Sequence, residues 1–179
     1  MRDIAPGKLE LVRLFVNTAD LEDGTDALAA PAALAGWLEQ HGIAHGASAT
    51  DADVAAAREL REAIRGLLLE NNGVRAREES AATLTRTAER ARLALRFEAA
   101  GEARLEPAAP GVVGALGRLV AIAATAMTDG TWSRLKACQA DPCGWAFYDH
   151  ARNHSRRWCS MAVCGNRTKA RSYRRRHAA

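Results

Sequence analysis

The sequence has little of what marks an exported or membrane-spanning protein. No uninterrupted run in its 179 residues approaches the ~20 apolar residues that a membrane-spanning helix requires. The first ten residues carry charges where a secretion signal needs an apolar stretch. We therefore expect a cytoplasmic protein with no membrane partner, in a reducing compartment that keeps cysteines free of disulfide bonds.

The sequence also lacks the common signatures of enzyme active sites. It has no G-x-S-x-G or H-E-x-x-H pattern and no glycine-rich phosphate loop. His41 and His45 flank a glycine in an expected loop, and the carboxylates lie at salt-bridge spacing on expected helices. Asn17, Thr18 and Arg61 could line a ligand pocket, although a turn and a salt bridge explain them more simply. We expect no enzyme activity, and any ligand is unknown.

Aromatic residues and cysteines are scarce, and their distribution is uneven. The last 48 residues hold all four cysteines and six of the nine aromatic residues. They also hold 11 Lys and Arg against two acids, a net charge of +9, whereas residues 1–131 carry a net charge of −5. This asymmetry predicts two domains, 1–131 and 132–179, of which the basic one suits a polyanion such as DNA or RNA.

Helical periodicity dominates the first region. Helices are expected at Pro31 to about His41, Asp51–Asn71, about Glu79–Arg92 and about Val112–Thr128, whereas Leu9–Val16 fits a strand or a helix. The apolar period shortens to two at 93–98 and 103–106, which predicts a hairpin that turns at Gly101. The expected fold class is mainly α (α+β), with a helical N-terminal domain that carries a β-hairpin.

The two clearest helices supply a candidate core. Thr50 and Asp53 have the spacing of a capping box at the start of the longer one. Apolar residues then recur at helical spacing, and Met127 lies on the same expected face as the other apolar residues of the later helix. The candidate core comprises Val54, Leu60, Ile64, Leu67, Leu116, Leu119 and Val120.

The four cysteines have the spacing C-x4-C-x15-C-x4-C, at Cys138, Cys143, Cys159 and Cys164. Two close pairs separated by a longer loop are typical of a tetrahedral zinc site with four thiolates. Two disulfides would need an oxidising compartment. His150 and His154 could replace a cysteine as ligands, although solvated loop histidines explain them better because the cysteine set is complete. We therefore predict one structural zinc ion bound by the four cysteines.

The expected finger is treble-clef-like. Residues 145–148 and 156–158 are predicted to form a hairpin between the cysteine pairs, and a helix is predicted from Gly165 to about Arg176. A segment of this size cannot bury much core without a metal. The aromatic residues expected around the metal are Trp132, Trp145, Phe147, Trp158 and Tyr173.

The terminal helix carries a stripe of arginines that could bind successive phosphates. Arg167, Arg171, Arg174 and Arg175 lie at positions i, i+4, i+7 and i+8. The candidate nucleic-acid contacts are Asn166, Arg167, Lys169, Arg171, Arg174 and Arg175, although a solvated basic tail explains the stripe too. Arg167 could instead serve the cysteine cluster. The base sequence and the choice between DNA and RNA stay open.

Cys164-Gly165-Asn166-Arg167 and the cysteine block around it resemble the CGNR zinc-finger family. Residues 15–18, 37–38 and 60–63 resemble its companion N-terminal domain, ABATE. The resemblance implies a stress-induced bacterial transcription regulator that binds DNA through its finger. The N-terminal domain would then sense a ligand or mediate association, including a homodimer. The alternative is a non-catalytic protein-interaction module in which zinc is purely structural.

Overall fold

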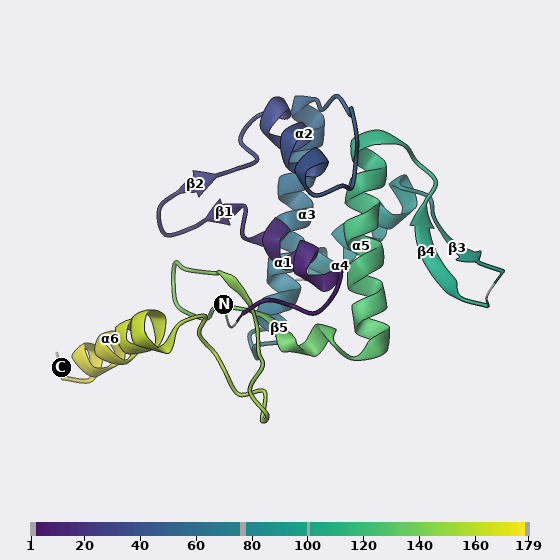
Figure 1. The fold of residues 1–179 in the computed structure, drawn as a ribbon. Helices are drawn as coiled ribbons and strands as arrows, with labels where there is room; N and C mark the ends of the chain where they lie inside the picture. The colour runs from purple at the N-terminus through teal and green to yellow at the C-terminus, as the bar shows by residue number, and fades with distance from the viewer. Residues whose placement is uncertain (1–2, 76–77, 100, 178–179) are drawn as a thin grey trace.

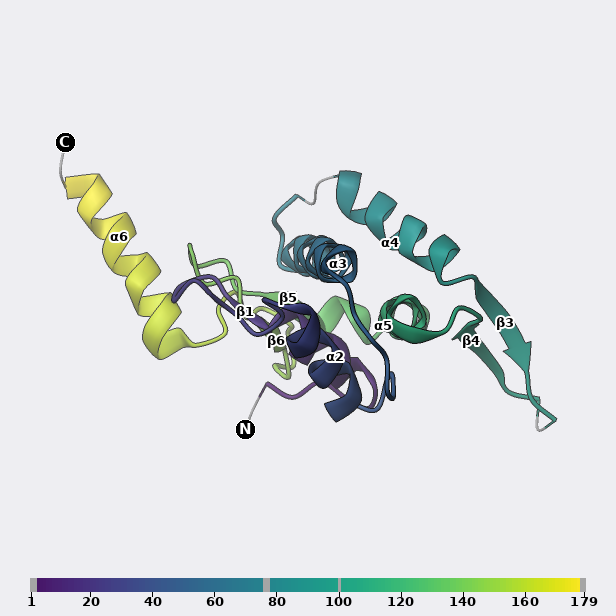
Figure 2. The same cartoon turned by 90° about the horizontal axis from the view of Figure 1, so that it is seen from above.

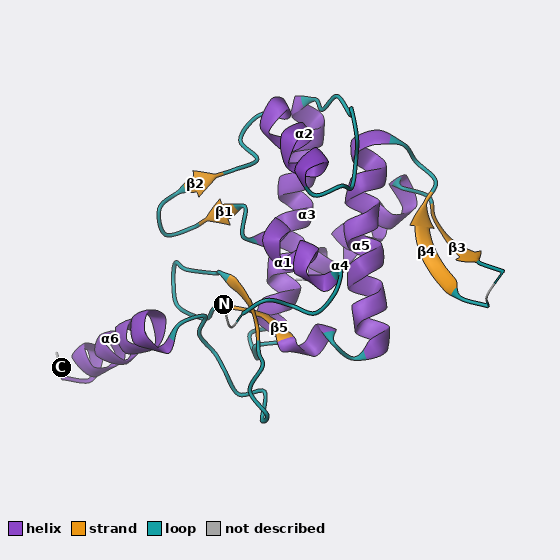
Figure 3. Ribbon diagram, in the orientation of Figure 1, coloured by secondary structure: helices purple, strands orange, loops and turns teal. Residues whose placement is uncertain are grey.

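The computed structural model describes residues 3–75, 78–99 and 101–177 (Figures 1 and 3). Six helices and three small antiparallel hairpins make up the part of the chain that is described, so the fold is mainly α, as expected. In chain order the elements are α1 (Leu9–Val16), β1 (Ala19–Asp20), β2 (Thr25–Asp26), α2 (Pro31–Gln40), α3 (Asp51–Glu70), α4 (Glu78–Arg90), β3 (Leu93–Phe97), β4 (Ala103–Pro107), α5 (Gly111–Asp129), a 3₁₀ turn η1 (Trp132–Arg134), β5 (Leu135–Ala137), β6 (Ala146–Tyr148), a π-turn η2 (Met161–Gly165) and α6 (Asn166–His177).

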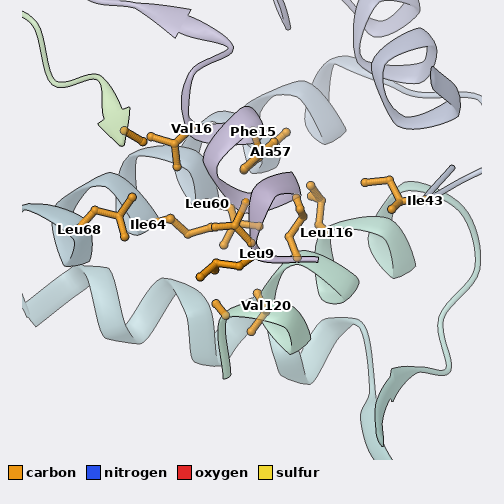
Figure 4. Close-up of a cluster of buried hydrophobic side chains, with 14 of the residues drawn as sticks. Leu9, Phe15, Val16, Ile43, Ala57, Leu60, Ile64, Leu68, Leu116 and Val120 are labelled. Carbon is orange, nitrogen blue, oxygen red and sulfur yellow. The ribbon is translucent and has the colours of Figure 1, made fainter. Parts of the chain in front are cut away.

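The core lies where α1, α3 and α5 meet. Leu9 and Phe15 of α1, Leu60 and Ile64 of α3 and Leu116 of α5 belong to one buried cluster, part of which Figure 4 shows. Helical spacing brings these side chains to one face of each helix, and burial removes that face from water. The candidate core is confirmed except for Leu67, which is only partly buried against the cluster.

Local signals predicted the helix boundaries well. The Thr50 hydroxyl accepts from the Asp53 N–H, and the Asp53 carboxylate accepts from the Thr50 N–H at 2.9 Å, which completes the capping box. The ambiguous segment from Leu9 to Val16 is a helix, because Leu9, Val12, Phe15 and Val16 then share the buried face. Met127 is 44 % exposed. Its predicted place on the buried face is therefore wrong, because Ala123 and Ala126 form the buried face at this end of α5.

Helix α5 is an exception to the expectation that no segment is long and apolar enough to span a membrane. By length and composition its 19 residues could cross a membrane, with a mean hydropathy of 1.6. Much of this helix is instead buried inside the protein, against α1, α3 and α4. Small side chains permit this close packing, since a Cβ at Gly117 would lie 2.2 Å from the Cβ of Ala91. Core packing therefore accounts for the apolar character of α5.

The hairpin β3–β4 and helix α6 project from opposite ends of the molecule (Figures 1 and 2). β3 and β4 pair antiparallel with Leu95 opposite Leu105, and the predicted turn residue Gly101 has a positive φ of 83°. Sequence analysis did not predict the short hairpin β1–β2. It is anchored by Arg61, whose guanidinium donates to Asp26 at 2.7 and 2.9 Å.

Candidate metal centre and basic helix

The four predicted ligands come together in one cluster. The sulfur atoms of Cys138, Cys143, Cys159 and Cys164 all lie within 4.8 Å of one another. Cys143 Sγ and Cys164 Sγ each lie 3.7 Å from Cys159 Sγ. These separations are too long for disulfide bonds, which need about 2.05 Å, and all four cysteines are free.

The cluster fits one structural zinc ion. A tetrahedron with Zn–S bonds of about 2.3 Å has sulfur–sulfur edges of about 3.8 Å, close to the separations found here. Without a cation, hydrogen bonding to Cys138 Sγ raises the pKa of Cys143 to about 12. The pKa of Cys159 is raised further, because its thiol hydrogen-bonds to Cys138 and Cys143. Zn²⁺ would replace these protons and hold four thiolates, with no open position for water.

The two cysteine pairs occupy different local structures. Cys138 and Cys143 lie in the turn between β5 and β6, which the Cys138 N–H closes by donating to the Trp145 carbonyl at 2.9 Å. Cys159 and Cys164 flank the start of η2, directly before α6. At Gly165 a Cβ would lie 2.5 Å from Met161 Sδ and 3.4 Å from the Trp158 ring. Only glycine fits this position without displacing its neighbours.

The expected strand pairing of the finger is wrong. The strand at Ala146–Tyr148 pairs with Leu135–Ala137, which precedes the first cysteine, and not with residues 156–158. The metal-binding turn therefore forms the tip of the hairpin. Segment 156–158 instead contacts that turn through a backbone hydrogen bond, from the Gln139 N–H to the Arg157 carbonyl at 3.1 Å, and through the packing of Trp158 against the cysteines.

The aromatic residues expected around the metal divide between three environments. Trp145, Phe147 and Trp158 do pack with the cysteines. Trp132 lies in the main core instead, together with Leu135 and Tyr148. Tyr173 is 59 % exposed and stacks on His177. The finger thus has a smaller core than expected, because β5 and β6 are shared with the helical body.

Arg167 is held beside the cluster and contacts the body of the protein. One of its terminal nitrogens lies 3.5 Å from Cys164 Sγ and 2.9 Å from a Glu22 oxygen, and the other donates to the second Glu22 oxygen. The ion pair with Arg167 lowers the pKa of Glu22. Asn166 donates to the Ala162 carbonyl at 3.1 Å, in the second cysteine pair. This geometry favours a role for Arg167 at the cluster.

Sequence analysis did not predict a buried ion pair inside the finger. Lys136 Nζ donates to the Asp149 carboxylate at 2.9 Å, and the side chains are 5 % and 0 % exposed. Asp149 also accepts from the N–H groups of Ala151 and Arg156, both at 3.0 Å. Although burial would raise the pKa of Asp149, these donors lower it overall. The pair organises the loop after β6. Residue spacing in the sequence does not distinguish these two buried charges from charges at the surface.

Polar side chains of the body hold the finger in place. Asn17 exchanges two hydrogen bonds with the Ala146 backbone, at 2.7 and 2.9 Å. Arg65 is buried and donates to the Gly144 carbonyl at 2.6 Å and to the Val16 carbonyl at 2.9 Å. Asn72 donates to the carbonyls of Ala137 and Arg157 at 2.8 and 2.9 Å. Asn71 donates to the carbonyls of Trp132 and Leu135 at 2.8 and 2.9 Å. We call these four residues the seam.

Contacts within the protein account for the three residues considered for a ligand pocket. Asn17 binds the backbone of β6, and Thr18 accepts from Arg61 at 3.1 Å. Arg61 is buried and pairs with Asp26. The structure thus supports the simpler interpretation, a turn and a salt bridge. His150 contacts the Ile4 carbonyl at 2.9 Å, and neither His150 nor His154 belongs to the cysteine cluster.

Helix α6 presents most of its bases to solvent. Among its residues, all of which the structure describes, none is buried. Lys169, Arg174 and Arg175 are exposed, and the Arg174 guanidinium contacts only a carbonyl of its own helix. Arg171 donates to the Asp141 carbonyl at 2.5 Å, near the first cysteine pair. Three predicted contact residues, Asn166, Arg167 and Arg171, are therefore engaged at the base of α6, whereas Lys169, Arg174 and Arg175 are exposed along it.

A helical body joined through β5 and β6 to a four-cysteine metal centre defines a zinc-finger protein. Family models agree with this class. The ABATE model, described as "Putative stress-induced transcription regulator", matches residues 10–130, and the CGNR zinc-finger model matches residues 134–177. The chain belongs to the ABATE family and carries a CGNR zinc finger at its C-terminal end. A search of curated proteins found no match.

Proposed function

We propose that this protein regulates transcription by binding duplex DNA through α6. The observation that carries the proposal is a helix with six Lys and Arg, no acid and no buried residue, which projects from the body (Figure 2). Such a helix can approach the phosphates of a duplex without first leaving a protein partner. Neutralised phosphates release counterions, which drives association at low salt.

The free bases and the engaged ones suit different tasks. Lys169, Arg174 and Arg175 can meet phosphates, which fix the position of a protein on DNA but carry no sequence information. Arg171 and Asn166 lie near the metal-held end, where the helix is anchored. Side chains with a fixed position are better suited to reading base edges. Sequence specificity is therefore expected to depend on Arg171 and Asn166.

The body gives the finger a defined orientation and offers a place for a ligand. The seam connects α1 and α3 directly to the hairpin that holds the metal. A groove of about 960 Å³ lies between the start of α1, β4 and α5, and its lining includes Lys8, Leu11, Arg118 and Ile122. This volume and mixture of side chains suit a small molecule. We assign the sensing role of the N-terminal domain to this groove.

The test is a salt titration of duplex DNA binding. Each phosphate contact that is removed should lower the slope of log K against log salt by about 0.9. Arg174→Ala/Arg175→Ala should therefore weaken binding to every sequence and lower the slope by about two. The matched control is Arg75→Ala/Arg90→Ala, which removes two exposed bases from the body and should leave the slope unchanged.

The same titration distinguishes the alternatives. Equal slopes for wild type and the α6 variant would show that this helix is not the DNA-binding surface. Absence of binding even at low salt would favour the protein-interaction module, in which zinc is only structural. Duplex and single-stranded RNA as competitors report whether RNA binds better than DNA.

A further inference from the structure

The loop of the β1–β2 hairpin places acids beside the start of α6. This hairpin extends from the helical body on the same side of the molecule as α6 (Figure 1). The loop contains Asp20, Glu22 and Asp23 and no Lys or Arg. The Glu22 carboxylate accepts hydrogen bonds from both terminal nitrogens of Arg167, one of them at 2.9 Å. A carboxylate of the body thus occupies a base at the start of α6.

This loop has a fixed turn and an anchor in the body. The Asp20 carboxylate accepts from the backbone N–H groups of Glu22 and Asp23, at 2.9 and 3.1 Å, which fixes the turn that carries Glu22. β2 is held on α3 by the buried Arg61, which pairs with Asp26 at 2.7 Å. The hairpin therefore presents Glu22 to α6 at a defined position, and it ties that position to the core of the body.

The pair between Glu22 and Arg167 is the point at which the body holds α6. Within residues 3–75, 78–99 and 101–131, Glu22 alone forms a hydrogen bond or ion pair with a residue of α6. Arg167 also contacts Cys164 Sγ at 3.5 Å, but this contact uses a separate N–H of the same terminal nitrogen. Another anion can therefore replace the Glu22 carboxylate while Arg167 stays at the cysteine cluster.

The exposure of this ion pair makes it weak enough to exchange. The side chains of Arg167 and Glu22 are 26 % and 44 % exposed. Exposed ion pairs contribute little free energy, because solvent and salt screen the charges and both side chains lose freedom. A phosphate offers a guanidinium the same two parallel hydrogen bonds as a carboxylate, and on DNA its neutralisation also releases counterions. A backbone phosphate is therefore the anion that competes best with Glu22 for Arg167.

We propose that Glu22 is an autoinhibitory latch, which occupies Arg167 in the free protein and gives way to a phosphate when duplex DNA binds. The latch rests on the proposed function, because it regulates the same helix. Opening it breaks the ion pair, and the charges of Asp20 and Asp23 repel the incoming phosphate. The body thereby lowers the affinity of α6 for DNA, although Arg167 becomes a phosphate contact in the complex.

DNA binding by Glu22→Gln tests the latch on the full zinc-loaded chain. At low salt this variant should bind duplex DNA about two- to fivefold more tightly than the wild type, because no ion pair has to break. Glu59→Gln is the matched control, since it removes the same charge from an exposed ion pair with Arg86, between α3 and α4, and should change the affinity far less. Equal, salt-dependent binding by wild type and Glu22→Gln would overturn the latch alone. Absence of binding by both would overturn the proposed function and the latch with it.

A double-mutant cycle separates the latch from general charge repulsion. Arg167→Gln should lower the slope of log K against log salt by about 0.9, because one phosphate contact is lost. In this background Glu22→Gln should tighten binding far less than it does in the wild type. A gain that is equally large without Arg167 would overturn the latch and show that Glu22 acts only as a nearby charge.

The zinc content of each variant reports whether the finger is intact. If Arg167→Gln loses zinc, Arg167→Lys provides the same comparison, since lysine keeps the charge but cannot form two parallel hydrogen bonds. The gain from Glu22→Gln should then be smaller than in the wild type, and an undiminished gain would again overturn the latch.

Discussion

Helices α3 and α6 show how differently the two ends of this molecule are built. α3 buries eight of its twenty residues, including Arg61 and Arg65, and meets the other helices of the body. α6 buries none of its twelve described residues and follows directly from the last metal ligand. An apolar core therefore holds α3 in place, whereas α6 depends on the cysteine cluster at its first turn. The apolar core and the metal cluster thus stabilise different parts of the chain.

The core shared by β5, β6 and the helical body qualifies this comparison. β5 and β6 belong by sequence to the cysteine-rich region, yet Leu135, Ala137, Ala146 and Tyr148 lie in the main core. The part that depends on metal is therefore smaller than the segment 132–179. The domain boundary at residue 131 stays a prediction, and the shared core argues that the two parts do not fold as independent units.

The largest expected effect follows loss of a metal ligand. Cys159→Ser removes one of four thiolates, and metal binding in such modules supplies folding free energy. The zinc content, measured on the purified chain, should fall from one per chain to well below one. Circular dichroism should show that most of the helical signal remains, because α1, α3 and α5 have their own core. A full complement of zinc in this variant would contradict the ligand assignment.

Breaking the buried ion pair should cost less, yet more than most core substitutions. Lys136→Met leaves the Asp149 carboxylate buried without its cation, which costs about 3–5 kcal/mol. Urea unfolding of the zinc-loaded chain measures the loss. Lys169→Met, at an exposed position of α6, is the matched control and should change stability by less than about 0.5 kcal/mol. Equal effects of the two substitutions would show that the pair contributes nothing.

Ile64→Ala tests the core of the body. Ile64 is fully buried in α3, so the substitution should lower the free energy of unfolding by about 2–5 kcal/mol. Leu67→Ala, on the same helix but only partly buried, should cost less. Urea denaturation of both variants provides the comparison. A loss under about 0.5 kcal/mol for Ile64→Ala would mean that this face of α3 is not core.

The smallest effect concerns acid stability. Hydrogen bonds from Arg61 lower the pKa of Asp26 from 3.8 to about 2. The carboxylate is thus more acidic in the folded protein, and its contribution is present above pH 4 and lost as the pH falls toward 2. The contribution is about 2 kcal/mol. Asp26→Asn should remove this part of the pH dependence in urea titrations between pH 5 and 2. An unchanged pH dependence of stability would show that the ion pair between Asp26 and Arg61 contributes no stability.

Much of the fold followed from local signals. Apolar periodicity located α2 to α5, and the Thr50–Asp53 spacing gave the start of α3. Alternation gave β3 and β4, and paired cysteine spacing gave the metal cluster. Each of these features depends on residues that are close in sequence. The family match and the arrangement of the four cysteines both identify the zinc finger, because both depend on residues that are close in sequence.

The errors share a different physical origin. Arg65 and Lys136 look like surface charges in the sequence, but both are buried because partners 79 and 13 residues away satisfy them. The pairing of β6 with β5 depends on the core beneath them, since Tyr148 and Leu135 lie opposite each other and both pack into the body. Residue spacing within one segment carries no information about such long-range partners.

Amide hydrogen exchange with and without a zinc chelator tests the central claim, that the metal holds the finger while the apolar core holds the body. The N–H groups of Gln139 and Gly165, which donate to the Arg157 and Ser160 carbonyls, report on the finger. Amides of Leu60 in α3 and Leu119 in α5 report on the body. We predict that chelation removes protection at Gln139 and Gly165 and leaves Leu60 and Leu119 protected. Loss of protection at all four positions together, or at none, would contradict the claim.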